Sequence, residues 1–347
     1  MYRGRCIMTR KAGGKKILIR FAVIGSGWRS LFYVRIARAL PDMFELTALL
    51  CRGQEKADRI QKEYGIHTTT SEDEIIASKP DFVVSAVNKS SMSDVVRYWA
   101  AKGIPVLSET PAGLDIDTLK AIRQDVENGA RIQVAEQYFL YPSIKALIDE
   151  CKSGTIGEPV SLTISAMHDY HAASVIRRML GTGLEDVAIT GKTFSMKVTD
   201  TRTRYEVLTE GRVVEKEEKH LIMEYADGKT AFYDFMSDQY RSPIRNRYIN
   251  LRGTRGEIIN DTVYYLDKDN LAACKKLDIT NPYGYAGLSE DEAAITGILL
   301  GMKEYVDTGK EVYPMDEALY DAYIGILMCE AGKPGYKQVK GSFGDIL

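Results

Sequence analysis

Short apolar runs alternate with amphipathic segments from Ile17 to about Val134. Buried strands separated by crossover helices produce this pattern in a parallel sheet. Turn signals fall between the runs: Pro41 closes the first helix, and Gly103 and Gly129 stand where later helices end. We therefore predict a doubly wound sheet whose strands are Ile17–Ile24, Glu45–Leu50, His67–Thr69, Phe82–Val87, Val106–Ser108 and Ile132–Ala135.

The period of the pattern changes after a helix predicted at Tyr141–Lys152. From Val160 to Ala166, apolar residues alternate with serine and threonine, which is typical of a strand with one face in solvent. The chain ends in helices, one of them opened by a capping box of Ser289 and Glu292. These features predict an open-faced, largely antiparallel second sheet, with further strands at Phe194–Val198, Leu221–Tyr225, Thr230–Phe235, Tyr248–Leu251 and Val263–Leu266.

A length of 347 residues is typical of two domains. We expect a disordered leader at residues 1–16 and a dinucleotide-binding type of parallel-sheet domain at residues 17–138. Residues 139–347 would form a second domain that binds substrate and mediates oligomerisation. The predicted fold class is α/β for the first domain and α+β for the second.

Charges and cysteines narrow the classes of partner. A formal net charge of -2, with acidic and basic residues interspersed, provides no field that would attract nucleic acid or an anionic membrane. The five cysteines lie far apart with no CxxC spacing, which argues against disulfides and favours the reducing cytoplasm. Ile17–Ile24 follows a basic start as in a signal peptide, but Arg20 interrupts it and no small-residue cleavage site follows. We therefore interpret this segment as a strand.

The first motif with chemical content is the turn Gly25-Ser26-Gly27-Trp28-Arg29-Ser30. It lies between a predicted strand and a predicted helix, where a Rossmann dinucleotide fingerprint belongs. Gly25 permits the tight turn, Gly27 lets the backbone approach a pyrophosphate, and the amides of the helix N-terminus attract the phosphates. The alternative of a purely structural turn stays open. The residues predicted here to bind the cofactor are Gly25, Ser26, Gly27, Trp28 and Arg29.

The end of the second strand bears on the choice between the two nicotinamide dinucleotides. Proteins that prefer NAD usually carry an acidic residue there, which binds the ribose 2'-hydroxyl. This chain has Cys51 at that position, followed by Arg52. The missing acid and the nearby guanidinium favour a 2'-phosphate, so we predict a slight preference for NADP over NAD. The alternative is that Arg52 is a solvated surface residue.

Several segments, in their order and spacing, are similar to a known family. They are the glycine-rich turn after the first strand, EKADRIQKEYGI, AAKGIPVLSETPAG, SGTIGEPVSL and the later INLRGTRGEI. Together they cover about residues 17 to 330 and resemble the Gfo/Idh/MocA family of sugar and cyclitol oxidoreductases. The resemblance implies a Rossmann domain, an open-faced sheet domain, and hydride transfer between a nicotinamide and a carbohydrate-like alcohol or ketone.

Two signatures of that family are altered in this chain. Its Glu-Lys-Pro signature reads Glu109-Thr110-Pro111, so a threonine replaces the lysine that approaches the substrate hydroxyl. Thr110 can hydrogen-bond but brings no positive charge to a developing alkoxide. The family's catalytic histidine matches His171, whereas the aspartate four residues earlier matches Met167. Either Asp169 has taken the place of that aspartate, or the motif is aligned out of register.

Histidines concentrate in the same segment, because two of the four in the chain are His168 and His171, with Asp169 and Tyr170 between them. A neutral imidazole can take a hydroxyl proton as hydride leaves the same carbon, and a carboxylate can orient the ring. We predict His171 as the acid/base, with Asp169, Tyr170 and His168 as further catalytic residues. The alternatives are that the histidines cap a helix or pack in a domain interface. A metal site is not predicted, because no third ligand has a recognisable spacing.

Further candidates stand at the carboxyl edge of the first sheet, where ligands bind in open α/β sheets. Lys89 could supply the cation lost at Thr110, although a solvated loop lysine is the simpler interpretation. Tyr138 and Tyr141 could contact nicotinamide or sugar, or pack between the domains. The remaining predicted cofactor contacts are Val87, Asn88, Lys89, Glu109, Thr110 and Gln137.

The combined prediction is an NAD(P)-dependent oxidoreductase that transfers a hydride between nicotinamide and a sugar, cyclitol or sugar derivative. The alternative is a non-catalytic dinucleotide- or sugar-binding regulatory protein on the same fold, which the missing lysine and the displaced aspartate would explain. An open-faced sheet must cover its apolar side, and a partner subunit commonly does so, which predicts a homodimer or homotetramer.

Overall fold

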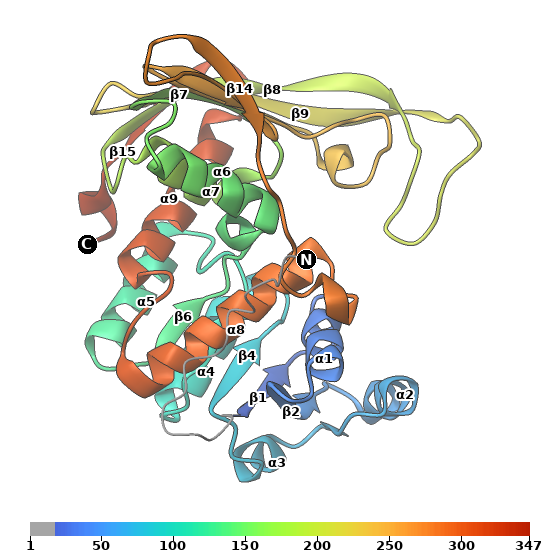
Figure 1. Ribbon diagram of the computed structural model, residues 1–347. Coiled ribbons are helices and arrows are strands. Elements are labelled where there is room, and N and C mark those ends of the chain that lie inside the picture. The colour runs from blue at the N-terminus through green and yellow to red at the C-terminus, as the bar shows by residue number, and fades with distance from the viewer. Residues whose placement is uncertain (1–17) are drawn as a thin grey trace.

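The computed structural model describes residues 18–347. The predicted leader at residues 1–16 lies outside this range. Two sheets organise the molecule, with sheet A in the lower half of Figure 1 and sheet B across its top. The α/β class predicted for the first domain and the largely antiparallel sheet predicted for the second are both confirmed, with one parallel pair in the second sheet.

Sheet A has the strand order β3-β2-β1-β4-β5-β6 and parallel pairing throughout. The order reverses between β1 and β4, and ligands of open α/β sheets bind in the crevice at the carboxyl ends of such strands. β1 and β4 are almost wholly apolar and buried, as parallel strands covered on both faces must be. The strands are β1 (Ile19–Ile24), β2 (Phe44–Leu50), β3 (Thr68–Thr69), β4 (Phe82–Ser85), β5 (Val106–Ser108) and β6 (Ile132–Val134).

Local signals explain where the helices around sheet A begin and end. The first helix stops before Pro41, and Gly65 closes the second with a left-handed φ of 65°. The side chains of Ser71 and Asp115 accept hydrogen bonds from backbone amides of the turns that follow them. The helices are α1 (Ser30–Ala39), α2 (Gln54–Tyr64), α3 (Glu72–Ala77), α4 (Lys89–Ala101) and α5 (Ile116–Glu127).

Sheet B has the strand order β14-β13-β12-β11-β7-β10-β9-β8-β15, in which only β7 and β10 pair in parallel. Its strands alternate between buried and exposed residues, because one face packs on helices and the other does not. The strands are β7 (Pro159–Ser165), β8 (Val187–Thr199), β9 (Val213–Tyr225), β10 (Thr230–Phe235), β11 (Tyr248–Gly253), β12 (Gly256–Ile259), β13 (Thr262–Leu266), β14 (Ala272–Lys276) and β15 (Lys337–Gly341).

The remaining helices join the two sheets. They are α6 (Pro142–Lys152), α7 (Asp169–Leu180), α8 (Glu290–Thr308) and α9 (Met315–Ala331). Short 3-10 helices lie at Tyr138–Leu140, Ser237–Tyr240, Gly284–Ala286 and Phe343–Ile346. Helices α6, α7 and α9 lie below sheet B in Figure 1, whereas α8 returns to sheet A and packs against α1. No helix within residues 18–347 combines the length and the apolar character that a bilayer span requires.

Candidate functional site

The turn between β1 and α1 has the geometry of a phosphate-binding loop. Gly25 has a φ of 111°, and a Cβ there would lie 2.5 Å from the carbonyl oxygen of Ala86, so only glycine fits. A Cβ on Gly27 would meet no atom within 4 Å, which leaves open space above the backbone. Ser30, at the third glycine position, is buried and faces the Ala86 carbonyl at 3.5 Å. Its side chain therefore does not obstruct that space.

The end of β2 carries no carboxylate. Cys51 is buried and its thiol hydrogen-bonds to Ser26, and burial raises the pKa of the thiol. Arg52 is exposed beside it. At the neighbouring β4, Val87 lies against Gly25, and Asn88 occupies the N-cap of α4 without a side-chain cap bond. These residues therefore surround the glycine turn at the carboxyl edge of sheet A.

Arg29 ties the glycine turn to more distant parts of the chain. Its Nε donates to Glu109 at 2.7 Å, and its Nη1 donates to Asp291 of α8 at 3.1 Å. The hydroxyl of Tyr33 also donates to Glu109, at 2.5 Å. Gln137 donates from Nε2 to Asp291 at 3.1 Å, and its Oε1 is buried with no hydrogen-bond partner. Arg29 and Glu109 are thus bonded to each other, while Gln137 keeps a free acceptor.

The residues at this edge can hold a nicotinamide dinucleotide. The backbone at Gly27 can approach a pyrophosphate closely because nothing fills the space above it. The buried Oε1 of Gln137 needs a donor, which a carboxamide would supply. Trp28 is exposed on the rim of the turn, under the guanidinium of Arg204 at 4.2 Å.

His171 is held by a carboxylate that the sequence reasoning did not identify. Its Nδ1 lies 2.5 Å from Oε2 of Glu136, and both side chains are buried. The second oxygen of Glu136 accepts from the backbone N–H of Tyr138 at 2.9 Å. Burial lowers the pKa of His171 well below its ordinary value and raises that of Glu136. Among residues 18–347 nothing hydrogen-bonds to Nε2, so this nitrogen can take a proton from a ligand.

His168 lies between two hydroxyl groups. Its Nδ1 is 2.5 Å from the hydroxyl of Tyr240 and its Nε2 is 3.0 Å from that of Tyr170. Burial, reinforced by repulsion from His171, lowers the pKa of His168 to about 3. The ring is therefore neutral at ordinary pH. Tyr170 in turn hydrogen-bonds to Thr110, which links the histidines to the Glu-Thr-Pro turn of sheet A.

Asp169 does not contact His171 in the way the sequence reasoning expected. Its carboxylate instead accepts from Lys219 at 2.6 Å and lies 3.4 Å from the thiol of Cys329. Lys89, the first residue of α4, places its Nζ 5.1 Å from the ring centre of Tyr170. Lys89 thus lies over the ring of Tyr170, the residue whose hydroxyl bonds to Thr110.

The structure thus gathers Thr110, Gln137, His168, Tyr170 and His171 around one edge of sheet A. Arg52 lies apart from them, at the end of β2. Sequence reasoning missed the residues that position this group, namely Glu136, Tyr240 and Asp291.

Of these three residues, only Glu136 could have been identified from the sequence, because it is an acidic residue directly after an apolar strand and beside Gln137. Tyr240 and Asp291 come from distant segments and carry no local pattern. Within residues 18–347 no three potential metal ligands cluster.

A family model and several solved structures place the fold. Residues 19–136 match the model of an oxidoreductase family with an NAD-binding Rossmann fold. An Agrobacterium radiobacter oxidoreductase, solved with NAD+, L-tartaric acid and magnesium, is 18% identical with a TM-score of 0.72, over 96% of this chain and 100% of that one. Levoglucosan dehydrogenase with NADH and levoglucosan is 16% identical with a TM-score of 0.72, over 93% and 99%.

A myo-inositol dehydrogenase from Corynebacterium glutamicum is 17% identical with a TM-score of 0.66, over 93% of this chain and 99% of that one. No curated protein sequence matches the chain. At these identities the solved structures establish the shared fold of both domains.

Proposed function

We propose that this chain, whose residues 19–136 match the model of the Gfo/Idh/MocA oxidoreductase family, is a dehydrogenase or reductase that acts on a sugar, cyclitol or sugar derivative. The observation that carries the proposal is the buried Glu136–His171 pair. Within the described part of the chain Nε2 of His171 has no partner, and the histidine lies in the same cluster of side chains as Thr110. The dehydrogenases of myo-inositol and levoglucosan that share the fold support this class of substrate.

In the proposed reaction the chain's own residues manage the proton. A bound nicotinamide supplies the acceptor or donor of hydride. Nε2 of His171 accepts the hydroxyl proton while the carbon loses hydride, and the Nδ1 proton moves to Glu136, whose raised pKa makes it a good acceptor. Lys89 and Thr110 stabilise the developing alkoxide in place of a lysine at position 110.

The test combines binding and turnover. The reduced nicotinamide is followed by absorbance with NAD or NADP and a panel containing myo-inositol, levoglucosan and tartrate. We expect turnover on at least one polyol, lost in His171→Ala and kept in His220→Ala, since His220 is an exposed histidine on β9. Tight dinucleotide binding without any turnover would favour the regulatory binding protein, and binding of neither dinucleotide would refute the dehydrogenase or reductase.

The cofactor preference is a separate proposal. The buried thiol of Cys51 at the end of β2, with Arg52 exposed next to it, supports NADP over NAD. In Arg52→Ala we expect weaker NADP binding and unchanged NAD binding by calorimetry. Arg59→Ala, at an exposed arginine on the helix α2 that follows, serves as the control and should change neither. Equal loss of both affinities in Arg52→Ala would contradict the preference.

The expected homo-oligomer also stays a proposal. Ile222 of β9, Phe232 of β10 and Tyr264 of β13 are exposed, and Ile222 and Phe232 are direct neighbours across the strands. Such apolar residues on the face of sheet B that carries no helix in Figure 1 support a contact with a second subunit. Sedimentation of Phe232→Lys against the unaltered protein tests this, with a smaller particle as the expected result.

A further inference from the structure

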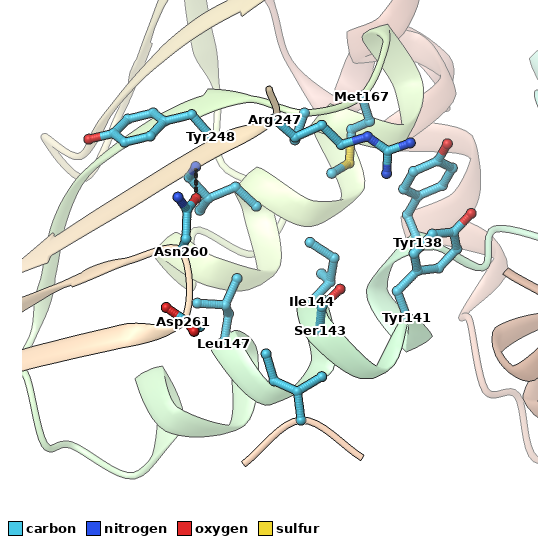
Figure 2. A pocket seen from close by; sticks show the side chains of 13 residues that line it. Tyr138, Tyr141, Ser143, Ile144, Leu147, Met167, Arg247, Tyr248, Asn260 and Asp261 are labelled. Carbon is cyan, nitrogen blue, oxygen red and sulfur yellow. Dashed lines mark hydrogen bonds between the residues drawn. The ribbon is translucent and has the colours of Figure 1, made fainter. Parts of the chain in front are cut away.

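A cavity of about 260 Å³ lies in the second domain, next to the histidines but not lined by them. Its floor is α6, and its walls come from the end of β7, from β11 and from the turn between β12 and β13, as Figure 2 shows. Most of the lining is carbon, contributed by side chains such as Ile144, Leu147 and Met167. We call this space the Arg247 cavity, after the cation at its rim.

The aromatic wall of the Arg247 cavity is the pair Tyr138 and Tyr141. Their rings stack with centres 4.6 Å apart and planes 11° from parallel. Tyr138 also contacts the ring of His171, with centres 4.2 Å apart. The cavity therefore borders the candidate reaction site through one shared side chain.

Arg247 is the one cation on the lining that nothing in residues 18–347 neutralises. Its guanidinium lies 5.2 Å from the ring centre of Tyr240, and within residues 18–347 no carboxylate lies at ion-pair distance from it. In Figure 2 it extends along the rim beside Met167 and Tyr138. The carboxylate at the other end of the cavity, Asp261, is paired with Lys276 at 2.9 Å. The net charge offered to a ligand is thus positive.

Size and chemistry together define the ligand. An engineered cavity of about 150 Å³ accommodates benzene, so about 260 Å³ has room for a six-membered ring with one carboxyl group. A polyol fits this lining poorly, since its hydroxyls would be buried against carbon without partners. A carboxylate, by contrast, matches the planar fork of donors on a guanidinium.

We propose that the Arg247 cavity binds a monocyclic organic acid, with the ring against Tyr138 and Tyr141 and the carboxylate on Arg247. This inference goes beyond the proposed oxidoreductase activity and does not depend on it. Because Tyr138 packs on His171, a ligand in the cavity would also hold the Tyr138 ring in place against the histidine.

The test measures binding by the full-length protein, with benzoate and cyclohexanecarboxylate as probes and benzyl alcohol as the uncharged counterpart. We expect both acids to bind at millimolar concentration or below, and benzyl alcohol to bind at least about tenfold more weakly. Arg247→Gln should lose about tenfold or more in affinity for the acids, because it removes the charged fork.

Arg245→Gln is the matched control, since Arg245 lies two residues away, forms no ion pair among the described residues and does not line the cavity. It should bind the acids as the unaltered protein does. Ala166→Leu, which adds bulk to the cavity wall, should weaken both acids and the alcohol. Undetectable binding of both acids to the unaltered protein, or equal affinity in Arg247→Gln, would overturn the proposal whether or not the protein turns over a sugar.

Discussion

Glu136 and His171 form a pair whose behaviour follows from burial. The low dielectric opposes charge on the imidazole, so the pKa of His171 falls, and it strengthens proton binding by the Glu136 carboxylate, whose pKa rises. The histidine is then neutral and ready to accept a proton, and the carboxyl group beside it is ready to share that proton. A solvated histidine with no carboxylate would offer neither property.

Glu136→Gln tests this pair. The substitution keeps the size of the side chain but removes the group that takes the Nδ1 proton, so we expect kcat to fall about 10²- to 10⁴-fold with unchanged dinucleotide affinity.

In the unaltered enzyme the acid limb of kcat/KM should lie below the ordinary histidine pKa of 6.5, because the base stays neutral until pH falls through its lowered pKa. An unchanged kcat in the variant would rule out a catalytic part for Glu136.

His168 gives a prediction about stability. Its pKa is about 3 in the folded protein and near 6.5 when unfolded, so between these values only the unfolded chain binds the proton. This group alone makes the free energy of unfolding fall by up to about 1.4 kcal/mol for each pH unit of acidification.

His168→Gln removes that proton site together with the bonds to Tyr240 and Tyr170. The variant should be less stable at neutral pH but should lose stability less steeply on acidification to about pH 5. Urea unfolding across this range measures both slopes. Parallel slopes would show that His168 titrates normally in the folded protein.

At the scale of elements, the sequence predicts sheet A almost to the residue. β1 and β4 are almost continuous apolar runs with glycine or proline close by, so burial and turn chemistry agree there. β12, β14 and β15 were not predicted, because segments such as Ala272–Lys276 and Lys337–Gly341 are short and charged and are held by their neighbours' hydrogen bonds. β8 and β9 extend beyond the predicted stretches for the same reason.

In the candidate site, too, local sequence signals predict some residues, and contacts between distant segments supply the others. His171 and Tyr170 stand on a helix start that the sequence marks, and Thr110 stands after a clear strand. The partners that fix them come from elsewhere in the chain: Glu136 from the end of β6, and Tyr240 from beyond β10. Contacts between distant segments are set by the tertiary fold, and no local period encodes them.

The turn between β1 and α1 supplies a matched pair of variants. Gly25→Ala places a methyl group 2.5 Å from the Ala86 carbonyl at a positive φ, which should cost about 1–3 kcal/mol of stability and also weaken dinucleotide binding. Gly27→Ala meets no atom, so the thermal midpoint should hardly change while dinucleotide affinity falls. Thermal melts and calorimetric titrations separate the two effects. Normal affinity in Gly27→Ala would place the phosphates elsewhere.

At the scale of the whole molecule, Arg29 joins the two halves through Glu109 and Asp291. Arg29→Met would leave both carboxylates without their cation, and we expect the free energy of unfolding to fall by about 3 kcal/mol. This value is at the low end for a buried pair, because the side chain of Asp291 is 24% exposed. Arg20→Met breaks the exposed pair with Glu45 and should cost under about 1 kcal/mol. Equal losses in denaturant unfolding would contradict this account.

Helix α8 has one more consequence, for engineering. It packs on α1, and Glu292 pairs with Arg35 at 2.5 Å, so the half of the molecule around sheet A is completed by residues that come late in the chain. A chimera that exchanges the half around sheet B must therefore be spliced at two junctions, one after β6 and one before Ser289. A single crossover after β6 would pack α1 against a helix of the other protein, and the arginines of α1 would lose their acidic partners.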